Sequence, residues 1–251
     1  MAARLALSLA FLLAAAGPLR AETSGLPPGF VYLAAAVPTI RQDIRYAGSF
    51  NFLGRPVAGY RAGECILTER AARAIGAVQA ELAGRGLTLV VWDCYRPASA
   101  VADFMAWSRD GADTRMARVF YPAVDKRRLV AEGYVSARST HARGSTVDLG
   151  LARSAAPAGR RGEGPCIAPA GQRADEGTLD FGTAFDCFDP RSALTDGRIG
   201  ASARANRLLL RDVMSRHGFR GYAREWWHFQ LRDEPFPATT FDFPVVARPQ
   251  R

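Results

Sequence analysis

Two of the three histidines in the chain lie in short segments that look like the two halves of one metal site. The first segment, 139–148, contains His141 and ends at Asp148, and the second, 225–228, ends at His228. A hydrolytic zinc site takes three nitrogen or oxygen ligands from the protein and keeps a fourth position for water. Each of these residues taken singly is more often structural than a ligand. Their combination predicts one Zn²⁺ per chain, bound by His141, Asp148 and His228.

Two further residues suit the proton and charge chemistry of such a site. Glu225 is placed to take a proton from an activated water and to deliver one to a leaving amine. A regular strand would put Glu225 and His228 on opposite faces, so we expect a bulge or twist between them. Arg96 follows an apolar run, and its cation suits the negative charge of a tetrahedral carbonyl oxygen. The alternative for Arg96 is a purely structural ion pair.

The hydrophobic periodicity predicts a single compact α+β domain in which helices flank an antiparallel sheet. Thr68 is a good N-cap, and Gly84 ends the helical pattern that follows it. Pro97 is expected in the first turn of a second helix, which places Arg96 at a strand-to-helix junction. The composition of 152–177, rich in Gly, Ala, Pro and charge, predicts an irregular insertion. The predicted helices cover 68–84, 97–107 and 203–217, and the predicted strands cover 87–92, 145–151 and 225–231.

The first 21 residues have the pattern of a secretory signal peptide. Arg4 precedes an apolar run over 5–16, and the small residue Ala21 stands at the expected cleavage point. Leu19 is larger than the usual residue before such a cut, so an uncleaved anchor is the alternative. No later stretch is long enough to span a bilayer. We therefore expect a mature domain over 22–251, without a transmembrane anchor, in the periplasm or outside the cell.

The net charge of +9 does not by itself indicate a nucleic-acid partner. The arginines are dispersed, and the sequence has neither a run of five or six basic residues nor a repeat that alternates aromatic and basic positions. We therefore expect no nucleic acid to bind, and regard the charge as a solvated arginine-rich surface. Nothing in the sequence indicates a particular oligomeric state.

The four cysteines suggest disulfide bonds, because they form no CxxC motif and no zinc-finger spacing. Three pairings are possible for four cysteines. We favour Cys65 with Cys94 and Cys166 with Cys187, because each pair brackets one compact segment. The second bond would then pin the 152–177 insertion.

The two histidine segments resemble a known family of enzymes. The pattern Ser-x-His-x-x-Gly-x-x-x-Asp at 139–148, with Glu-Trp-Trp-His at 225–228, is similar to zinc peptidases that include D-alanyl-D-alanine dipeptidases, D,D-carboxypeptidases and fold relatives of the hedgehog signalling domain. Further segments narrow the resemblance to the dipeptidases, and it extends over about residues 30–246. These segments are Asp43-Ile44-Arg45-Tyr46, Asn51-Phe52, Gly54-Arg55-Pro56-Val57, Trp92-Asp93, Tyr95-Arg96-Pro97, Phe185-Asp186, Leu231-Arg232-Asp233-Glu234-Pro235 and Phe241-Asp242-Phe243-Pro244.

The resemblance implies a hedgehog-type D,D-peptidase fold and hydrolysis of the free dipeptide D-Ala-D-Ala at a small zinc site. It implies the same three zinc ligands as the residue chemistry, Glu225 as the catalytic base and Arg96 as the group that stabilises the tetrahedral intermediate. Asp186 matches the carboxylate that pairs with the free amino group of the substrate. Such a carboxylate would reject substrates whose amine is already acylated. Tyr46 and Ser139 match positions near the substrate.

Two functional alternatives stay open. One is a D,D-carboxypeptidase or peptidoglycan endopeptidase with the same zinc chemistry, and the other is a binding module without catalysis, against which Glu225 and Arg96 argue. Two departures from the family pattern bear on the site. Thr146 replaces a common alanine, a change without consequence unless its hydroxyl is left unpaired, and the long insertion before Asp186 has room to reshape the amine end of the pocket. Export would favour a role in scavenging or wall turnover.

Overall fold

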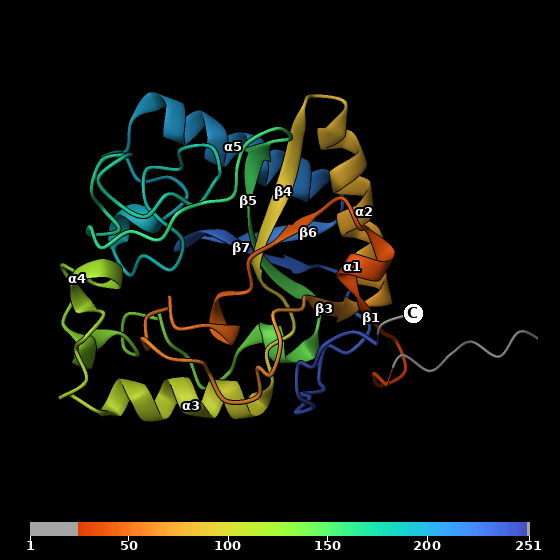
Figure 1. The fold of residues 1–251 in the computed structure, drawn as a ribbon, viewed down its shortest axis with the longest axis horizontal. Coiled ribbons are helices and arrows are strands. Elements are labelled where there is room, and N and C mark those ends of the chain that lie inside the picture. Colours follow the sequence, from red (N-terminus) through yellow and green to blue (C-terminus); the bar gives the residue numbers. More distant parts are fainter. Residues whose placement is uncertain (1–24, 250–251) are drawn as a thin grey trace, which may run out of the picture.

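The computed structural model describes residues 25–249, so the expected signal peptide at 1–21 lies outside the described residues. Secondary structure alternates between strands and helices along the chain (Figure 1). The elements in chain order are β1 (Phe30–Tyr32), α1 (Leu33–Ala36), β2 (Arg41–Gln42), η1 (Arg45–Ala47), β3 (Ile66–Thr68), α2 (Glu69–Ala83), β4 (Leu87–Asp93), α3 (Ala98–Arg109), α4 (Ala117–Phe120), η2 (Lys126–Arg128), η3 (Thr140–Arg143), β5 (Thr146–Arg153), η4 (Pro190–Ser192), α5 (Ala201–Arg216), β6 (Phe219–Tyr222) and β7 (Glu225–Leu231).

A five-stranded sheet in the order β2-β4-β5-β7-β6 forms the centre of the domain, and β1 and β3 form a separate antiparallel pair. The pairs β4–β5, β5–β7 and β6–β7 are antiparallel, as the sequence predicts. The edge strand β2 differs, because it pairs parallel with β4. The α+β class and the single compact domain are confirmed.

The long elements form where the sequence predicts them. Thr68 is the N-cap of α2, and its side chain accepts a hydrogen bond of 3.3 Å from the backbone N–H of Ala71. All seven residues of β4 are buried, which explains its continuous apolar run. One detail differs for α3: Pro97 is its N-cap, so that the first helical residue is Ala98.

Helices α2 and α5 contact each other through charged side chains at their ends. Glu81 of α2 lies 2.5 Å from Arg216 Nη2 and 2.9 Å from His217 Nε2, and His217 is the C-cap residue of α5. His217 is therefore a helix-terminal residue outside the metal site. Helix α3 lies apart from these two helices, beyond the end of β4 that leads into it (Figure 1). The β4–α3 junction therefore lies at the end of an interior strand of the sheet.

Stacked aromatic rings hold the 181–188 segment against the sheet. Phe185 stacks on Trp92 of β4 at 4.8 Å between ring centroids, and Phe181 stacks on Trp226 of β7 at 4.1 Å. All four side chains are buried. Burial of aromatic surface of this size is a major contribution to the core. Asp186 directly follows Phe185, so its position is set by the core rather than by the surface.

Both expected disulfides are present, Cys65–Cys94 and Cys166–Cys187. The 152–177 segment after β5 is irregular, as predicted, and the second disulfide connects it to the residue that follows Asp186. Within 25–249, no helix combines the length and the apolar character needed to cross a membrane.

Candidate active site

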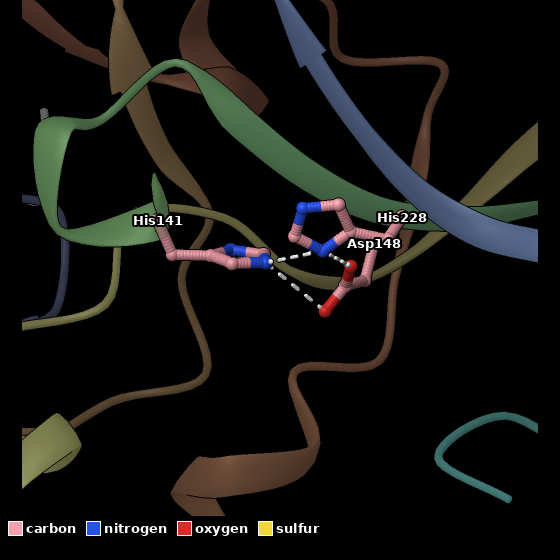
Figure 2. Close-up of side chains that lie close together, drawn as sticks. All are labelled: His141, Asp148 and His228. Carbon is pink, nitrogen blue, oxygen red and sulfur yellow. Dashed lines mark hydrogen bonds and ion pairs between the residues drawn. The ribbon is translucent and has the colours of Figure 1, made fainter. Parts of the chain in front are cut away.

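The side chains of the three predicted metal ligands point toward one another (Figure 2). Asp148 and His228 are direct partners across β5 and β7, and His141 comes from η3. His141 Nε2 lies 3.2 Å from His228 Nδ1 and 3.3 Å from Asp148 Oδ2, and His228 Nδ1 lies 3.1 Å from Asp148 Oδ1. Tetrahedral zinc with bonds of about 2.0–2.1 Å places neighbouring ligand atoms about 3.3 Å apart. The spacing of the three side chains therefore fits one zinc ion.

The surrounding contacts leave lone pairs facing the centre of this triad. The carbonyl oxygen of Cys94 only accepts, so His141 Nδ1–H donates to it at 2.7 Å and Nε2 keeps its lone pair. Asp148 Oδ1 is buried and makes no hydrogen bond of acceptable geometry, although His228 Nδ1 is near. A buried carboxylate oxygen without a hydrogen bond is costly unless a cation lies beside it. The donor set and its orientation both suit a bound metal ion.

The titration behaviour of the ligands follows from their burial and mutual proximity. Burial opposes ionisation of Asp148, but the adjacent His141 and His228 outweigh it and hold the pKa of the Asp148 carboxyl below its usual range. Burial also lowers the pKa of His228, with Asp148 opposing the shift. An ionised aspartate with a neutral histidine is the protonation state that metal binding requires.

Glu225 lies on the same side of β7 as His228, as the expected bulge requires. The register of the β6–β7 pair shifts between two neighbouring residues of β6: Gly221 pairs with Phe229, whereas Tyr222 pairs with Glu225. Glu225 Oε2 consequently lies 3.7 Å from His228 Nδ1. Burial, with the nearby Asp148 charge as the next cause, raises the pKa of Glu225 well above its ordinary value. A pKa closer to neutral pH allows a carboxylate both to accept a proton and to return it.

Arg96 occupies the junction between β4 and α3 and points toward the metal triad. Its Nη2 lies 3.7 Å from Asp148 Oδ2, and its Nη1 lies 3.4 Å from Ser139 Oγ. Its main ionic partner is Asp93, with Nη2 2.8 Å from Asp93 Oδ2. Burial alone would lower the pKa of Arg96, but the Asp93 carboxylate raises it, so the side chain stays cationic. The ion pair that was expected as the structural alternative is present, and it orients the guanidinium toward the metal triad.

Asp93 and Tyr60 belong to the site although sequence reasoning assigned them no role. Asp93 Oδ2 lies 3.3 Å from His141 Nδ1 as well as beside Arg96, and Tyr60 Oη donates to Asp93 Oδ1 at 2.5 Å. Both residues are buried. A carboxylate at the end of a nearly continuous apolar run is a signal that points to Asp93. Tyr60 has no comparable signal, because its contact joins distant parts of the chain.

Asp186 and Tyr46 form a buried pair at another wall of the site. Tyr46 Oη donates to Asp186 Oδ2 at 2.8 Å. Among the described residues other than glycine, Asp186 alone has a positive φ, 57°. Left-handed backbone at such a residue is typical of functional sites held in place by their surroundings. Burial, and then the charge of Asp148, raise the pKa of Asp186 well above its ordinary value.

All eight predicted site residues line one cavity of about 250 Å³. The remaining wall is largely aromatic and apolar, and a segment at 133–136 contributes to it. Thr146, which departs from the family pattern, has a buried hydroxyl without a hydrogen-bond partner in the described chain. The predicted residues at the cavity are Tyr46, Arg96, Ser139, His141, Asp148, Asp186, Glu225 and His228.

Comparison with known proteins identifies close similarity in sequence. A family model described as D-ala-D-ala dipeptidase (Peptidase_M15) matches residues 27–158 and 161–246. A D-alanyl-D-alanine dipeptidase of Enterococcus faecalis is 37% identical over 218 residues, which cover 86% of this chain and 98% of that protein. The D-alanyl-D-alanine dipeptidase of Escherichia coli is 30% identical over 202 residues, covering 80% and 83%. A crystal structure of a vancomycin-resistance D,D-pentapeptidase with Zn(II) matches at a TM-score of 0.35 and 14% identity, over 77% of this chain and 87% of that one.

Proposed function

The chain belongs to the D-Ala-D-Ala dipeptidase family of peptidases, and from this premise we propose that it hydrolyses the free dipeptide D-Ala-D-Ala to two molecules of D-alanine. The observation that carries the proposal is the shared cavity, in which a metal triad, an acidic residue and a cation surround a space of about 250 Å³. A cavity of this size suits a small substrate. Glu225 and Asp186 both line the cavity. We assign the first to the proton chemistry and the second to the amine end of the substrate.

His141, Asp148 and His228 are proposed to hold one Zn²⁺, for which their spacing and free lone pairs are suitable. The ion would polarise the scissile carbonyl and lower the pKa of a bound water to near neutrality. Asp93 and the Cys94 carbonyl both lie at His141 Nδ1, which fixes the tautomer of that ring. The His141 ring is therefore held in place by contacts outside the metal triad.

Glu225 is proposed to move the protons of the reaction. It takes one proton from the attacking water and delivers one to the nitrogen of the leaving D-alanine. Its raised pKa supports both directions of transfer, because the protonated form persists closer to neutral pH than it does for an exposed glutamate. Arg96, held by Asp93, balances the negative charge that develops on the carbonyl oxygen.

Asp186 is proposed to bind the free ammonium group of the dipeptide, with Tyr46 holding its carboxylate. An ammonium beside Asp186 would replace the solvent that burial removes from the carboxylate. An N-acylated substrate brings no charge to this position and leaves Asp186 buried without a counter-ion. The enzyme is thereby expected to be a dipeptidase rather than a carboxypeptidase.

We propose that the protein acts in the periplasm or outside the cell. The two disulfides are typical of oxidising compartments, and the first 21 residues have the pattern of a signal peptide. N-terminal sequencing of the protein recovered from the periplasm or medium of an expressing bacterium should begin at Glu22. An intact N-terminus in the cytoplasmic fraction would contradict this location.

The decisive experiment compares two substrates. The 22–251 chain, with oxidised disulfides, is incubated with D-Ala-D-Ala or N-acetyl-D-Ala-D-Ala, with zinc or with a chelator, and released D-alanine is measured. Zinc-dependent cleavage of the free dipeptide alone would support the proposal. Preferential cleavage of the acetylated substrate would instead indicate a carboxypeptidase, and no cleavage of either would favour a binding module.

A further inference from the structure

The Cys65–Cys94 disulfide lies directly behind the metal site. Cys94 is the first residue after β4, next to Asp93 and two positions before Arg96. Its partner Cys65 immediately precedes β3. Both cysteines are buried. The bond thus joins the short β1–β3 sheet to the loop that carries two residues of the site.

The backbone of Cys94 contacts a proposed metal ligand directly. Its carbonyl oxygen accepts the 2.7 Å hydrogen bond from His141 Nδ1, and two residues later the N–H of Arg96 donates to the His141 carbonyl at 3.3 Å. On the other side, the N–H of Tyr95 donates to the Ile66 carbonyl at 2.9 Å. The loop is therefore hydrogen-bonded to His141 on one side and to β3 on the other. The disulfide is attached to Cys94, the same residue whose carbonyl contacts His141.

We propose that the Cys65–Cys94 bond is a positioning element of the metal site, which holds the Cys94 carbonyl at His141 Nδ1 and thereby strengthens zinc binding. This inference rests on the proposed zinc site. A carbonyl in a loop is held by its neighbours along the chain, and a covalent link at the same residue restricts its displacement. Contacts that orient a metal-bound histidine change metal affinity about 10- to 100-fold when they are lost.

The competing explanation is that the bond only stabilises the folded state as a whole. A disulfide that spans 29 residues restricts the unfolded chain and raises stability without any effect on the site. The chain supplies a matched control, because Cys166–Cys187 spans a similar 21 residues. The backbone hydrogen bonds at its two cysteines join them to Val119, Ala184, Asp189 and Ser192, and none joins a proposed metal ligand.

The experiment measures zinc affinity by competition with a chromophoric chelator in three proteins: the wild type, C65A/C94A and C166A/C187A. Alanine at position 94 keeps the backbone carbonyl and removes the sulfur atom together with the link. Folding is checked by near-ultraviolet circular dichroism at 10 °C, and C65V/C94A, which refills the lost volume, replaces the first variant if that one is unfolded. We expect about tenfold weaker zinc binding in C65A/C94A and a change below twofold in C166A/C187A.

Each outcome decides the question. Equal zinc affinity in the folded C65A/C94A variant and the wild type would overturn the proposal, and so would an equal loss in both variants. Unfolding of both Cys65–Cys94 variants would overturn it as well, because the bond would then support the whole fold. Failure of the wild type to bind zinc at all would reject the proposed metal site itself, a result separate from the comparison between variants.

Discussion

Tyr60 donates a 2.5 Å hydrogen bond to Asp93 Oδ1 behind the active-site cavity, while the other oxygen of the same carboxylate contacts Arg96 and lies 3.3 Å from His141 Nδ1. One buried carboxylate therefore connects the cation of the site to a proposed metal ligand. Its position depends on a phenol that does not line the cavity. We infer that Asp93 and Tyr60 act as positioning residues, since neither lines the cavity.

Replacement of Tyr60 by Phe should lower kcat about tenfold with little change in KM, since a net hydrogen bond to a charged group contributes about 1.5–3 kcal/mol and part of that loss reaches Arg96. Steady-state kinetics on D-Ala-D-Ala, with zinc content measured in parallel, is the test. Tyr32→Phe is a matched control, because the buried Tyr32 hydroxyl has no hydrogen-bond partner in the described chain and Tyr32 does not line the cavity. An unchanged kcat in Tyr60→Phe would mean that Arg96 needs no such support.

The Glu225→Gln enzyme should keep its zinc and lose about 10²- to 10⁴-fold in kcat, the usual contribution of a general base. Glutamine preserves the size of the side chain but does not accept the proton. Glu234→Gln is the control, because Glu234 pairs with Arg143 rather than with the proposed metal ligands. Activity within a few fold of the wild type would remove Glu225 from the proposed mechanism.

Asp186→Asn should weaken the preference for a free amine. We expect at least about a tenfold rise in KM for D-Ala-D-Ala, because loss of one partner of a buried ion pair costs about 2–5 kcal/mol. The ratio of kcat/KM for the free and the N-acetylated dipeptide should fall by a comparable factor. A ratio that stays constant would place recognition of the amine elsewhere in the cavity.

The same substitution should stabilise the substrate-free protein at alkaline pH. A carboxyl whose pKa is raised on folding contributes stability below its ordinary pKa, and that contribution is lost as the pH rises through the raised value. Asparagine stays neutral throughout. The Tm of Asp186→Asn should therefore exceed that of the wild type at pH 8, and the difference should shrink toward pH 4. A gap that widens on acidification would contradict the raised pKa.

Thr146→Val should raise the free energy of unfolding by about 1 kcal/mol or more, since valine keeps the shape and removes a buried hydroxyl that has no partner. Urea denaturation of the two proteins measures the difference. Thr88→Val provides the contrast, because the Thr88 hydroxyl accepts a hydrogen bond from Gln79 at 3.0 Å and its loss should destabilise. A destabilised Thr146→Val would mean that the hydroxyl finds a partner in solution.

The long elements of the fold could be predicted because their signals are local. The Thr68 cap and the apolar face that follows it define α2, and β7 has its predicted bounds. Strand β2 has two residues and exists by pairing with β4, so no local pattern marks it. Strand β6 is mostly exposed, and its composition, Phe-Arg-Gly-Tyr, gives little sign of a strand.

The site was predictable where chemistry is concentrated in a short motif. His141, Asp148, Glu225 and His228 lie in two such motifs, and the family resemblance added Asp186 and Tyr46. The contacts that orient these residues were not predictable, because they join backbone and side chains that the chain order separates widely. The hydrogen bond from His141 to the Cys94 carbonyl is an example, since any residue type at position 94 offers the same oxygen.

The slip in the β6–β7 ladder has a mechanical consequence. Because it places Glu225 and His228 on one side of a single strand, the proposed base and the last metal ligand move as one body with β7. We therefore expect the distance between Glu225 and His228 to stay the same when substrate binds. Under the proposed function, any adjustment to different dipeptides would come from Asp186 and Tyr46, which lie outside the sheet on other segments of the chain.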